Sequence, residues 1–336
     1  MNRIIVVLLI VSLFSVNAYA YGPRGHHLVG AIADKRLAKN QAAAKKVRAL
    51  LDNLTLERVA TMPDEIKSWK CGRKPSGPNR INRELQAFVN ANCKSEPLHR
   101  DFHFTDVPVL GDEDYNDGEV GRTDFDVVQM ILFCVRVLKG EEPANNPRKI
   151  TKSVAVILLA HYLGDIHQPL HVGAEFFDNQ GNPFHPSENN RGFGDQGGNK
   201  LTLLTFFQGH LQPAGKLHSY WDGQTVENAF RNKPDPQVAQ QLSSKEPSGW
   251  KLNGDAETWA EQMANAILPT AREAHKRLEY DDIKLDMAKK EVASGTASEK
   301  HAAGDKFYAL WAADVVKSEI HKGGWRLAAL LEEVVQ

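Results

Sequence analysis

The chain has 336 residues and a formal net charge of −1 at pH 7. Apolar residues are plentiful, and the sequence contains no internal repeat or low-complexity tract, so a large core can form. The near-neutral charge, together with the absence of a basic stripe, excludes a protein that binds duplex nucleic acid non-specifically through surface cations.

The first residues have the pattern of a secretory signal peptide. A short start containing Arg3 precedes an apolar run over residues 4–16, and Ala18-Tyr19-Ala20 fits an A-x-A cleavage site. A membrane anchor is the alternative, but the run is shorter than the roughly 20 residues that span a bilayer. We therefore expect residues 1–20 to be removed and residues 21–336 to form one domain. The mature protein, starting at Tyr21, would be secreted or periplasmic.

Helical patterns dominate the mature chain. Apolar spacing predicts helices over residues 26–38, 41–52, 57–68 (interrupted near Pro63), 84–89, 124–139 and 147–167. Further helices are predicted over 218–229, 257–278, 283–294 and 300–321, with a terminal turn over 325–333. Residues 201–206 are the best strand candidate. The predicted fold class is all-α: a single mainly helical domain with long loops over 107–122 and 172–200 and little β-structure.

The three cysteines differ in their surroundings. Cys71 and Cys93 flank a polar segment and could form a disulfide, or could remain reduced. Cys134 lies in an apolar helical run and is predicted to be a buried free thiol.

The most informative stretch is the end of the apolar helix over 147–167. His161 and Asp165 are four residues apart and share one helical face. Pro169 cannot continue the helix, so the following turn should bring His171 back towards them. Two imidazoles and a carboxylate beside an apolar helix are typical zinc ligands. The alternative is a helix that happens to end in histidines, but burying such groups together without a partner is costly.

A second pair of the same spacing strengthens the metal hypothesis. His218 and Asp222 would also share a helical face. Further candidate ligands are His26, Asp64 and His103. Counting the amine of Tyr21 that cleavage would free, nine nitrogen or oxygen donors could serve three zinc ions, which such donors suit well.

These motifs resemble those of the zinc-dependent single-strand-specific nucleases and 3′-nucleotidases (the nuclease S-one and P-one type), which are related to the bacterial zinc phospholipases C. The resemblance covers essentially the whole mature chain. It runs from Gly25-His26 through residues 161–171, Gly197-Gly198-Asn199 and residues 218–222 to residues 326–331. It implies the mainly helical fold that phospholipases C and zinc nucleases share.

The resemblance implies three zinc ions and a ligand set for each. One ion would be held by Asp64, His103, His161 and Asp165. Its close neighbour would be held by the amine and carbonyl of Tyr21, by His26 and by Asp165 as a bridge. A third, more exposed ion would be held by His171, His218 and Asp222. The family usually begins with Trp, so Tyr21 is a departure that affects the packing around the second ion.

The resemblance also implies substrate-binding residues. Phe104 and Asp106 match a nucleobase slot, in which the ring stacks on the base and the carboxylate accepts from its edge. Lys67 matches a basic residue that steadies the phosphate, and Asn199 matches an amide at the same centre. Together with Asp165, these two are the candidate catalytic residues.

The implied activity is hydrolysis of single-stranded RNA and DNA, and of 3′-nucleotides, by metal-bound hydroxide. Cleavage of the P–O3′ bond would leave 5′-phosphorylated ends. One alternative is a phospholipase C using the same metals on a lipid head group, although Asp222 stands where the phospholipase pattern has Glu. The other is a secreted zinc-binding protein without catalysis. We expect a monomer without stable membrane association, with single-stranded nucleic acid or nucleotides as its partners.

The remaining histidines are predicted not to be ligands. His167 lies about 240° around the helix from His161, which favours a hydrogen-bonding role in the core. His27 and His99 match no ligand position. Surface positions are predicted for His185, His210, His275, His301 and His321.

Overall fold

The structure is a computed structural model that describes residues 21–74, 76–94, 96–143 and 145–335. The expected signal peptide, residues 1–20, lies outside the described residues. Within them, no helix is both long and apolar enough to cross a membrane.

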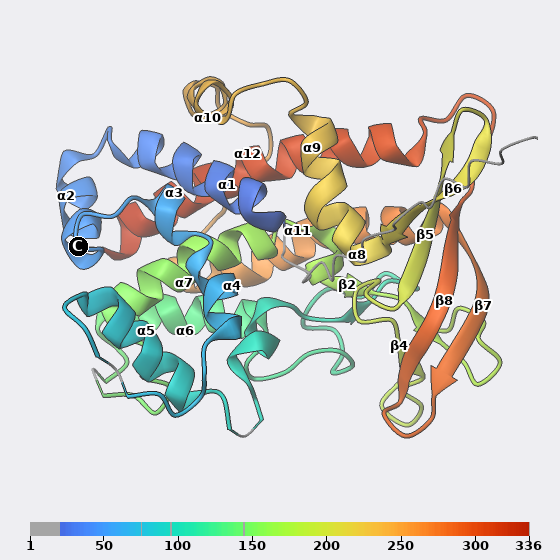
Figure 1. Cartoon of the computed structure of the whole chain (residues 1–336), viewed down its shortest axis with the longest axis horizontal. Coiled ribbons are helices and arrows are strands. Elements are labelled where there is room, and N and C mark those ends of the chain that lie inside the picture. Colours follow the sequence, from blue (N-terminus) through green and yellow to red (C-terminus); the bar gives the residue numbers. More distant parts are fainter. Residues whose placement is uncertain (1–20, 75, 95, 144, 336) are drawn as a thin grey trace, which may run out of the picture.

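A helix buried on all sides lies at the centre of the helical part (Figure 1). This helix, α7 (Lys152–Asp165), begins at Thr151, whose Oγ1 accepts a hydrogen bond from the backbone N of Val154 at 3.2 Å. Its hydrophobic residues face every direction because other helices surround it. The helices that pack directly against it include α1 (Gly22–Leu37), α6 (Val127–Lys139), α5 (Arg80–Ala91) and α12 (Tyr308–Val334).

The C-terminal helix α12 is longer than predicted. It is one continuous helix of 27 residues, whereas the sequence predicted a helix over 300–321 followed by a separate turn. Gly323 and Gly324 lie inside this helix and allow close packing. A Cβ on Gly324 would lie 2.5 Å from the side chain of Ile32 in α1, and a Cβ on Gly323 would lie 3.2 Å from the carbonyl oxygen of Leu163 in α7. Tight packing against two helices therefore compensates for the low helix propensity of glycine.

Most of the other helices are short, with the exception of the 18-residue α11 (Trp259–Lys276). The predicted interruption near Pro63 is confirmed, since this proline lies in the first turn of a new helix. The segments before α7 are α2 (Gln41–Leu50), α3 (Leu56–Val59), α4 (Met62–Glu65), η1 (Ile66–Ser68) and η2 (His99–His103). Those after it are η3 (Pro169–His171), α8 (Leu217–Ser219), the π-helical η4 (Tyr220–Gln224), α9 (Thr225–Ala229), α10 (Asp235–Ser244), η5 (Ala256–Thr258) and α11 (Trp259–Lys276).

The fold is mainly helical, as predicted, but it contains more β-structure than the sequence predicted. A six-stranded sheet lies at one end of the helical part (Figure 1). Its strand order is β3-β4-β8-β5-β6, with β7 also paired to β8. The strands are β3 (Phe176–Phe177), β4 (Phe193–Gly194), β5 (Leu201–Phe207), β6 (His210–Lys216), β7 (Leu278–Asp286) and β8 (Glu291–Glu299). A separate parallel pair consists of β1 (Val107–Pro108) and β2 (Gly173–Ala174).

Strand β5 confirms the predicted strand, whereas β7 and β8 occupy the region where a helix over 283–294 was predicted. That prediction was wrong because Ala, Lys and Glu in this stretch favour a helix locally. In the structure β8 pairs in parallel with β5 and antiparallel with β7, so distant pairing partners decide its conformation.

The cysteines form one disulfide. Cys71 and Cys93 are bonded and link the loop before α5 to the end of that helix. Cys134 is a buried free thiol in α6, as predicted.

Candidate metal centre

The last turn of α7 carries His161 and Asp165 into the interior. Both side chains are fully buried. Between them, Gly164 leaves room for His26 of α1, because a Cβ at this position would lie 2.6 Å from His26 Nδ1. The His26 ring consequently stacks on that of His161, with ring centroids 3.7 Å apart and planes inclined by 13°.

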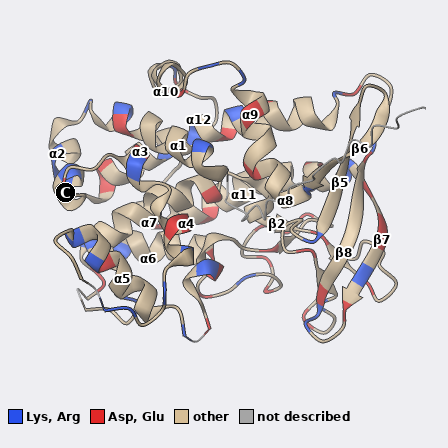
Figure 2. Ribbon diagram, viewed as in Figure 1, with Lys and Arg blue, Asp and Glu red and all other residues tan. Residues whose placement is uncertain are grey.

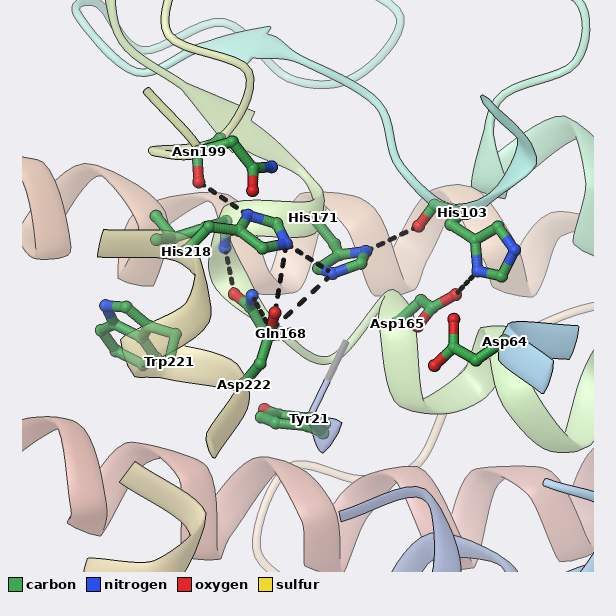
Figure 3. Close-up of polar contacts among 12 residues, drawn as sticks. Tyr21, Asp64, His103, Asp165, Gln168, His171, Asn199, His218, Trp221 and Asp222 are labelled. Carbon is green, nitrogen blue, oxygen red and sulfur yellow. Dashed lines mark hydrogen bonds and ion pairs between the residues drawn. The ribbon is translucent and has the colours of Figure 1, made fainter. Parts of the chain in front are cut away.

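A first group of ligand atoms forms around His161, and Figure 3 shows three of its members, Asp64, His103 and Asp165. Its Nε2 lies 3.0 Å from His103 Nδ1, 3.3 Å from Asp165 Oδ2 and 3.6 Å from Asp64 Oδ1. His103 Nδ1 lies 3.0 Å from Asp165 Oδ2. These four residues come from α4, η2 and α7, and the structure brings together all four that the sequence grouped.

A second group shares Asp165. The other oxygen of this carboxylate, Oδ1, lies 3.4 Å from His26 Nε2. Tyr21 is buried just before α1, and its hydroxyl donates to the carbonyl oxygen of His167. The backbone that follows Tyr21 lies against Asp222, because a Cβ on Gly22 would lie 3.1 Å from the Asp222 carbonyl oxygen, so this end of the chain lies near the third group as well as the second.

The third group comprises His171, His218 and Asp222, as predicted (Figure 3). His171 Nε2 lies 3.1 Å from His218 Nε2 and 3.9 Å from an oxygen of Asp222. His218 Nε2 lies 3.5 Å from Asp222 Oδ2. The turn η3 after Pro169 places His171, while the π-helical η4 places Asp222.

The tautomers of three histidines follow from their backbone contacts. His161 Nδ1 donates to the Ala60 carbonyl at 2.6 Å, His171 Nδ1 to the His103 carbonyl at 2.8 Å and His218 Nδ1 to the Gly197 carbonyl at 2.8 Å. A carbonyl can only accept, so each neutral ring directs the lone pair of Nε2 into the centre. Such backbone contacts are typical of metal-binding histidines.

The charge state of the centre also favours a cation. Burial lowers the pKa of His103, His161 and His171 well below the ordinary value, which keeps these rings neutral. Burial raises the pKa of Asp165 well above its ordinary value, and the charge of Asp64 adds to this. Asp165 Oδ1 and Asp222 Oδ2 are buried and have no hydrogen-bond partner among the described residues. Bound cations would compensate these carboxylates, so the residues present fit a metal centre.

A cavity of about 900 Å³ leads to the centre and is lined by His103, His171 and His218. Phe104 and Asp106 lie on its wall, with the Phe104 side chain 36% exposed. Burial, assisted by Glu291 and Asp126, raises the pKa of Asp106 to about 7. Gly121 holds this segment, because its carbonyl accepts from the Asp106 backbone N at 3.0 Å and a Cβ on it would collide with the Asp106 carbonyl.

The two other predicted site residues also line this cavity. Lys67 Nζ lies 2.7 Å from Asp64 Oδ1 and therefore stands at the edge of the first group. Asn199 is held near His218 by a hydrogen bond from its Nδ2 to the Gln196 carbonyl at 2.9 Å. Apart from Tyr21, which is buried just before α1, the structure places the predicted site residues either in the three groups or on the cavity that leads to them.

Some contributors were missed by the sequence. Gln168 Nε2 donates to Asp222 Oδ1 at 2.9 Å, and Arg326 Nη1 donates to His167 Nε2 at 2.8 Å. Both residues lie inside motifs that carried the resemblance, which was the available signal. His167 itself is a buried hydrogen-bonding residue, as predicted. The surface prediction for His275 was wrong, because its ring is buried and its Nδ1 lies 2.7 Å from the hydroxyl of Tyr280.

A mainly helical fold with three convergent His/Asp groups beside an open cavity defines the class of metal-binding hydrolases. Residues 21–336 match the family model described as S1/P1 Nuclease. Among similar proteins, Endonuclease 3 of Arabidopsis thaliana is 26% identical, covering 98% of this chain and 94% of that protein. Endonuclease 4 of the same plant is 25% identical, covering 94% of this chain and 90% of that protein. The chain belongs to the S1/P1 nuclease family and is a hydrolytic nuclease.

Proposed function

We propose that this protein is a secreted, zinc-dependent phosphodiesterase that hydrolyses single-stranded RNA and DNA, and 3′-nucleotides, to 5′-phosphorylated products. The observation that carries the proposal is the convergence of three sets of three side chains, in each of which the ligand atoms all lie within 4.8 Å of one another: Asp64, His103 and His161; His26, His161 and Asp165; and His171, His218 and Asp222. Imidazole nitrogens and carboxylate oxygens are the ligands that zinc prefers in catalytic sites.

Three zinc ions per chain would fit these groups. The first would be held by Asp64, His103, His161 and Asp165. The second would be held by His26, Asp165 and the amine and carbonyl of Tyr21. The third would be held by His171, His218 and Asp222. When bound, the ions supply positive charge that lowers the pKa of a water and offsets the charge developing on phosphate.

The side chains around the centre then position the substrate. Lys67 presents a cation beside the first group, where it can stabilise a non-bridging phosphate oxygen. Asn199 presents its amide near the third group. Phe104 is exposed on the cavity wall and can stack on a base only if that base has left a duplex, which would make the activity single-strand-specific. Asp106 lies beside it and can accept a hydrogen bond from the base edge.

The base slot also favours a nuclease over a phospholipase C. An aromatic ring and a carboxylate on the cavity wall suit a nucleobase. A choline head group has no N–H group that could donate a hydrogen bond to Asp106. The slot lies on the 3′-oxygen side of the phosphate in the family pattern, which is why we propose cleavage of the P–O3′ bond.

The test is hydrolysis of single-stranded RNA, single-stranded DNA and phosphatidylcholine by the zinc-loaded protein, with zinc content measured on the same sample. We expect both nucleic acids to be cleaved, with 5′-phosphate ends. Lipid turnover without nucleic-acid turnover would establish the phospholipase instead. Restored stability on adding zinc, without any hydrolysis, would establish a non-catalytic zinc protein.

Secretion with cleavage after Ala20 is part of the proposal. The proposal is supported by the burial of Tyr21 and by the backbone of the next residue, Gly22, which lies against Asp222. Amino-terminal sequencing of the exported protein should read Tyr21 first. A different first residue would remove the proposed amine ligand. We further propose that the mature enzyme is a monomer without stable membrane association, which size-exclusion chromatography and vesicle co-sedimentation would test.

A further inference from the structure

The outer rim of the cavity is rich in cations. Six cationic side chains line the cavity, against three carboxylates. The cations are Lys67, Arg100, Arg191, Lys200, Lys289 and Lys290. This excess of positive charge contrasts with a whole-chain net charge of −1. Because the rest of the chain is slightly acidic, the basic rim is a local feature that needs its own explanation.

Two of these cations lie on the turn of the β7–β8 hairpin, the pair of strands that the sequence had suggested to be a helix. Lys289 and Lys290 come directly before β8, and Figure 2 shows Lys/Arg colouring at the free end of this hairpin. Asp286 orders the turn by accepting from the backbone N of Ala288 at 3.1 Å and of Lys289 at 3.2 Å. Strand β8 of the hairpin pairs with β5 in the sheet, and the residues of the turn, Lys289 and Lys290, line the cavity.

The second side of the rim comes from the loop before β4. Gly194 of β4 pairs with Glu291 of β8, which brings this loop to the hairpin turn. Lys290 Nζ lies 5.3 Å from the centroid of the Phe193 ring. Arg191 is exposed two residues earlier. The two sides therefore form one continuous cationic edge, although they are about a hundred positions apart in the sequence.

Two of the six cations pair with carboxylates near the centre, Lys67 with Asp64 at 2.7 Å and Arg100 with Asp101 at 3.7 Å, whereas the other four are largely free of ion pairs. Within the described part of the chain, Arg191, Lys200 and Lys290 form no salt bridge, and Lys289 contacts only Asp286, at 3.5 Å. Lys289 is 69% exposed. Exposed cations that are not neutralised by carboxylates are suited to bind an anion from the solvent. A row of them fits the regularly spaced charges along a sugar–phosphate backbone.

We propose that the cationic rim formed by Arg191, Lys200, Lys289 and Lys290 is a track for the phosphates of a single strand beyond the phosphate that is cleaved. This inference rests on the proposed function, since it concerns how the same cavity receives a polymer. It assigns to the β7–β8 hairpin a preference for long single strands over mononucleotides. The centre and the base slot recognise one nucleotide, and the rim recognises chain length.

The experiment compares the double variant K289A/K290A with wild type and with a matched control, K45A/K46A. Lys45 and Lys46 are also adjacent and exposed, but they lie on α2, away from the cavity. For each protein, kcat/KM is measured on a 20-nucleotide single strand and on a 3′-mononucleotide, at several salt concentrations. Binding of a labelled 20-nucleotide phosphorothioate strand, which resists hydrolysis, is measured by fluorescence anisotropy.

We expect the ratio of kcat/KM for the 20-mer to that for the mononucleotide to fall about tenfold at low salt in K289A/K290A and to stay constant in K45A/K46A. The slope of log binding constant against log salt should become less steep by about 1.4, since each lost contact with a single strand removes about 0.7. An unchanged ratio and slope in K289A/K290A would overturn the proposal, as would an equal change in the control. Failure of the proposed function would look different, because wild type would then cleave neither substrate. The anisotropy measurement would still compare strand binding by wild type and K289A/K290A, and so would still test the rim.

Discussion

The Nε2 atoms of His171 and His218 lie 3.1 Å apart, while the Nδ1 of each ring donates to a backbone carbonyl. Two neutral nitrogens whose lone pairs face each other at this distance repel one another unless a cation lies between them. The backbone contacts thus arrange the two rings for a metal before any metal binds. This relationship gives the first prediction.

Replacing His218 with Ala should remove one zinc ion per chain and lower kcat/KM on single-stranded RNA by at least about a hundredfold. A missing ligand should cost no less than the 10- to 100-fold that loss of a supporting contact costs. Zinc is measured by elemental analysis and hydrolysis on the same preparation. His210 is exposed on β6 and H210A serves as the control, which should keep full zinc and activity. Full zinc content in H218A would contradict the assignment of the third group.

Asp165 should connect two ions, because Oδ1 faces His26 and Oδ2 faces His103 and His161. Asp165→Asn replaces one oxygen by an amide nitrogen that cannot bind a cation. Zinc content and turnover should therefore fall together. The control is D314N, at an exposed carboxylate paired with Lys306 on the surface. Normal turnover with three ions per chain in D165N would rule out the trinuclear arrangement.

Tyr21 should contribute through its hydroxyl to stability and through its backbone to metal binding. Y21F leaves the buried carbonyl of His167 without this donor and should lower the free energy of unfolding by about 1–3 kcal/mol. Zinc content should be unchanged, since the proposed ligands are backbone atoms. Denaturant unfolding and elemental analysis test the two halves separately. Loss of zinc at unchanged stability would contradict both halves of the prediction. It would show that the hydroxyl of Tyr21 supports metal binding and does not stabilise the fold.

Glu175 should make stability depend on pH. Burial raises its pKa from 4.5 to about 8, so between these values the unfolded chain is ionised while the folded protein keeps the proton. Folding then binds a proton, and stability decreases as pH rises through this window. E175Q removes the effect, so its free energy of unfolding relative to wild type should rise with pH between 5 and 8 by up to about 1.4 kcal/mol per unit. Urea unfolding at pH 5, 6.5 and 8 measures this. A pH-independent difference would show that Glu175 keeps its ordinary pKa.

The sequence predicted those parts of the molecule that depend on local spacing. Helix α7 and the pairs His161/Asp165 and His218/Asp222 follow from positions four residues apart. Grouping distant residues such as Asp64 and His103 required the family resemblance, because nothing local to either residue indicates the other. The β7–β8 hairpin was missed since β8 pairs with β5, whose partner residues, such as Leu201 for Gly295, lie more than ninety positions earlier. His275 was misplaced because its burial depends on Tyr280 and the strand β7 that carries it.

The burial of Tyr21 at the start of α1, next to Asp222, has a consequence for the timing of activity. A nitrogen inside a peptide bond has its lone pair delocalised and cannot bind a cation, whereas a terminal amine can. Under the proposed cleavage after Ala20, the precursor would lack one metal ligand until its leader is removed. The active enzyme would then form only on export, and the precursor would not hydrolyse the RNA of the producing cell while it is still inside that cell.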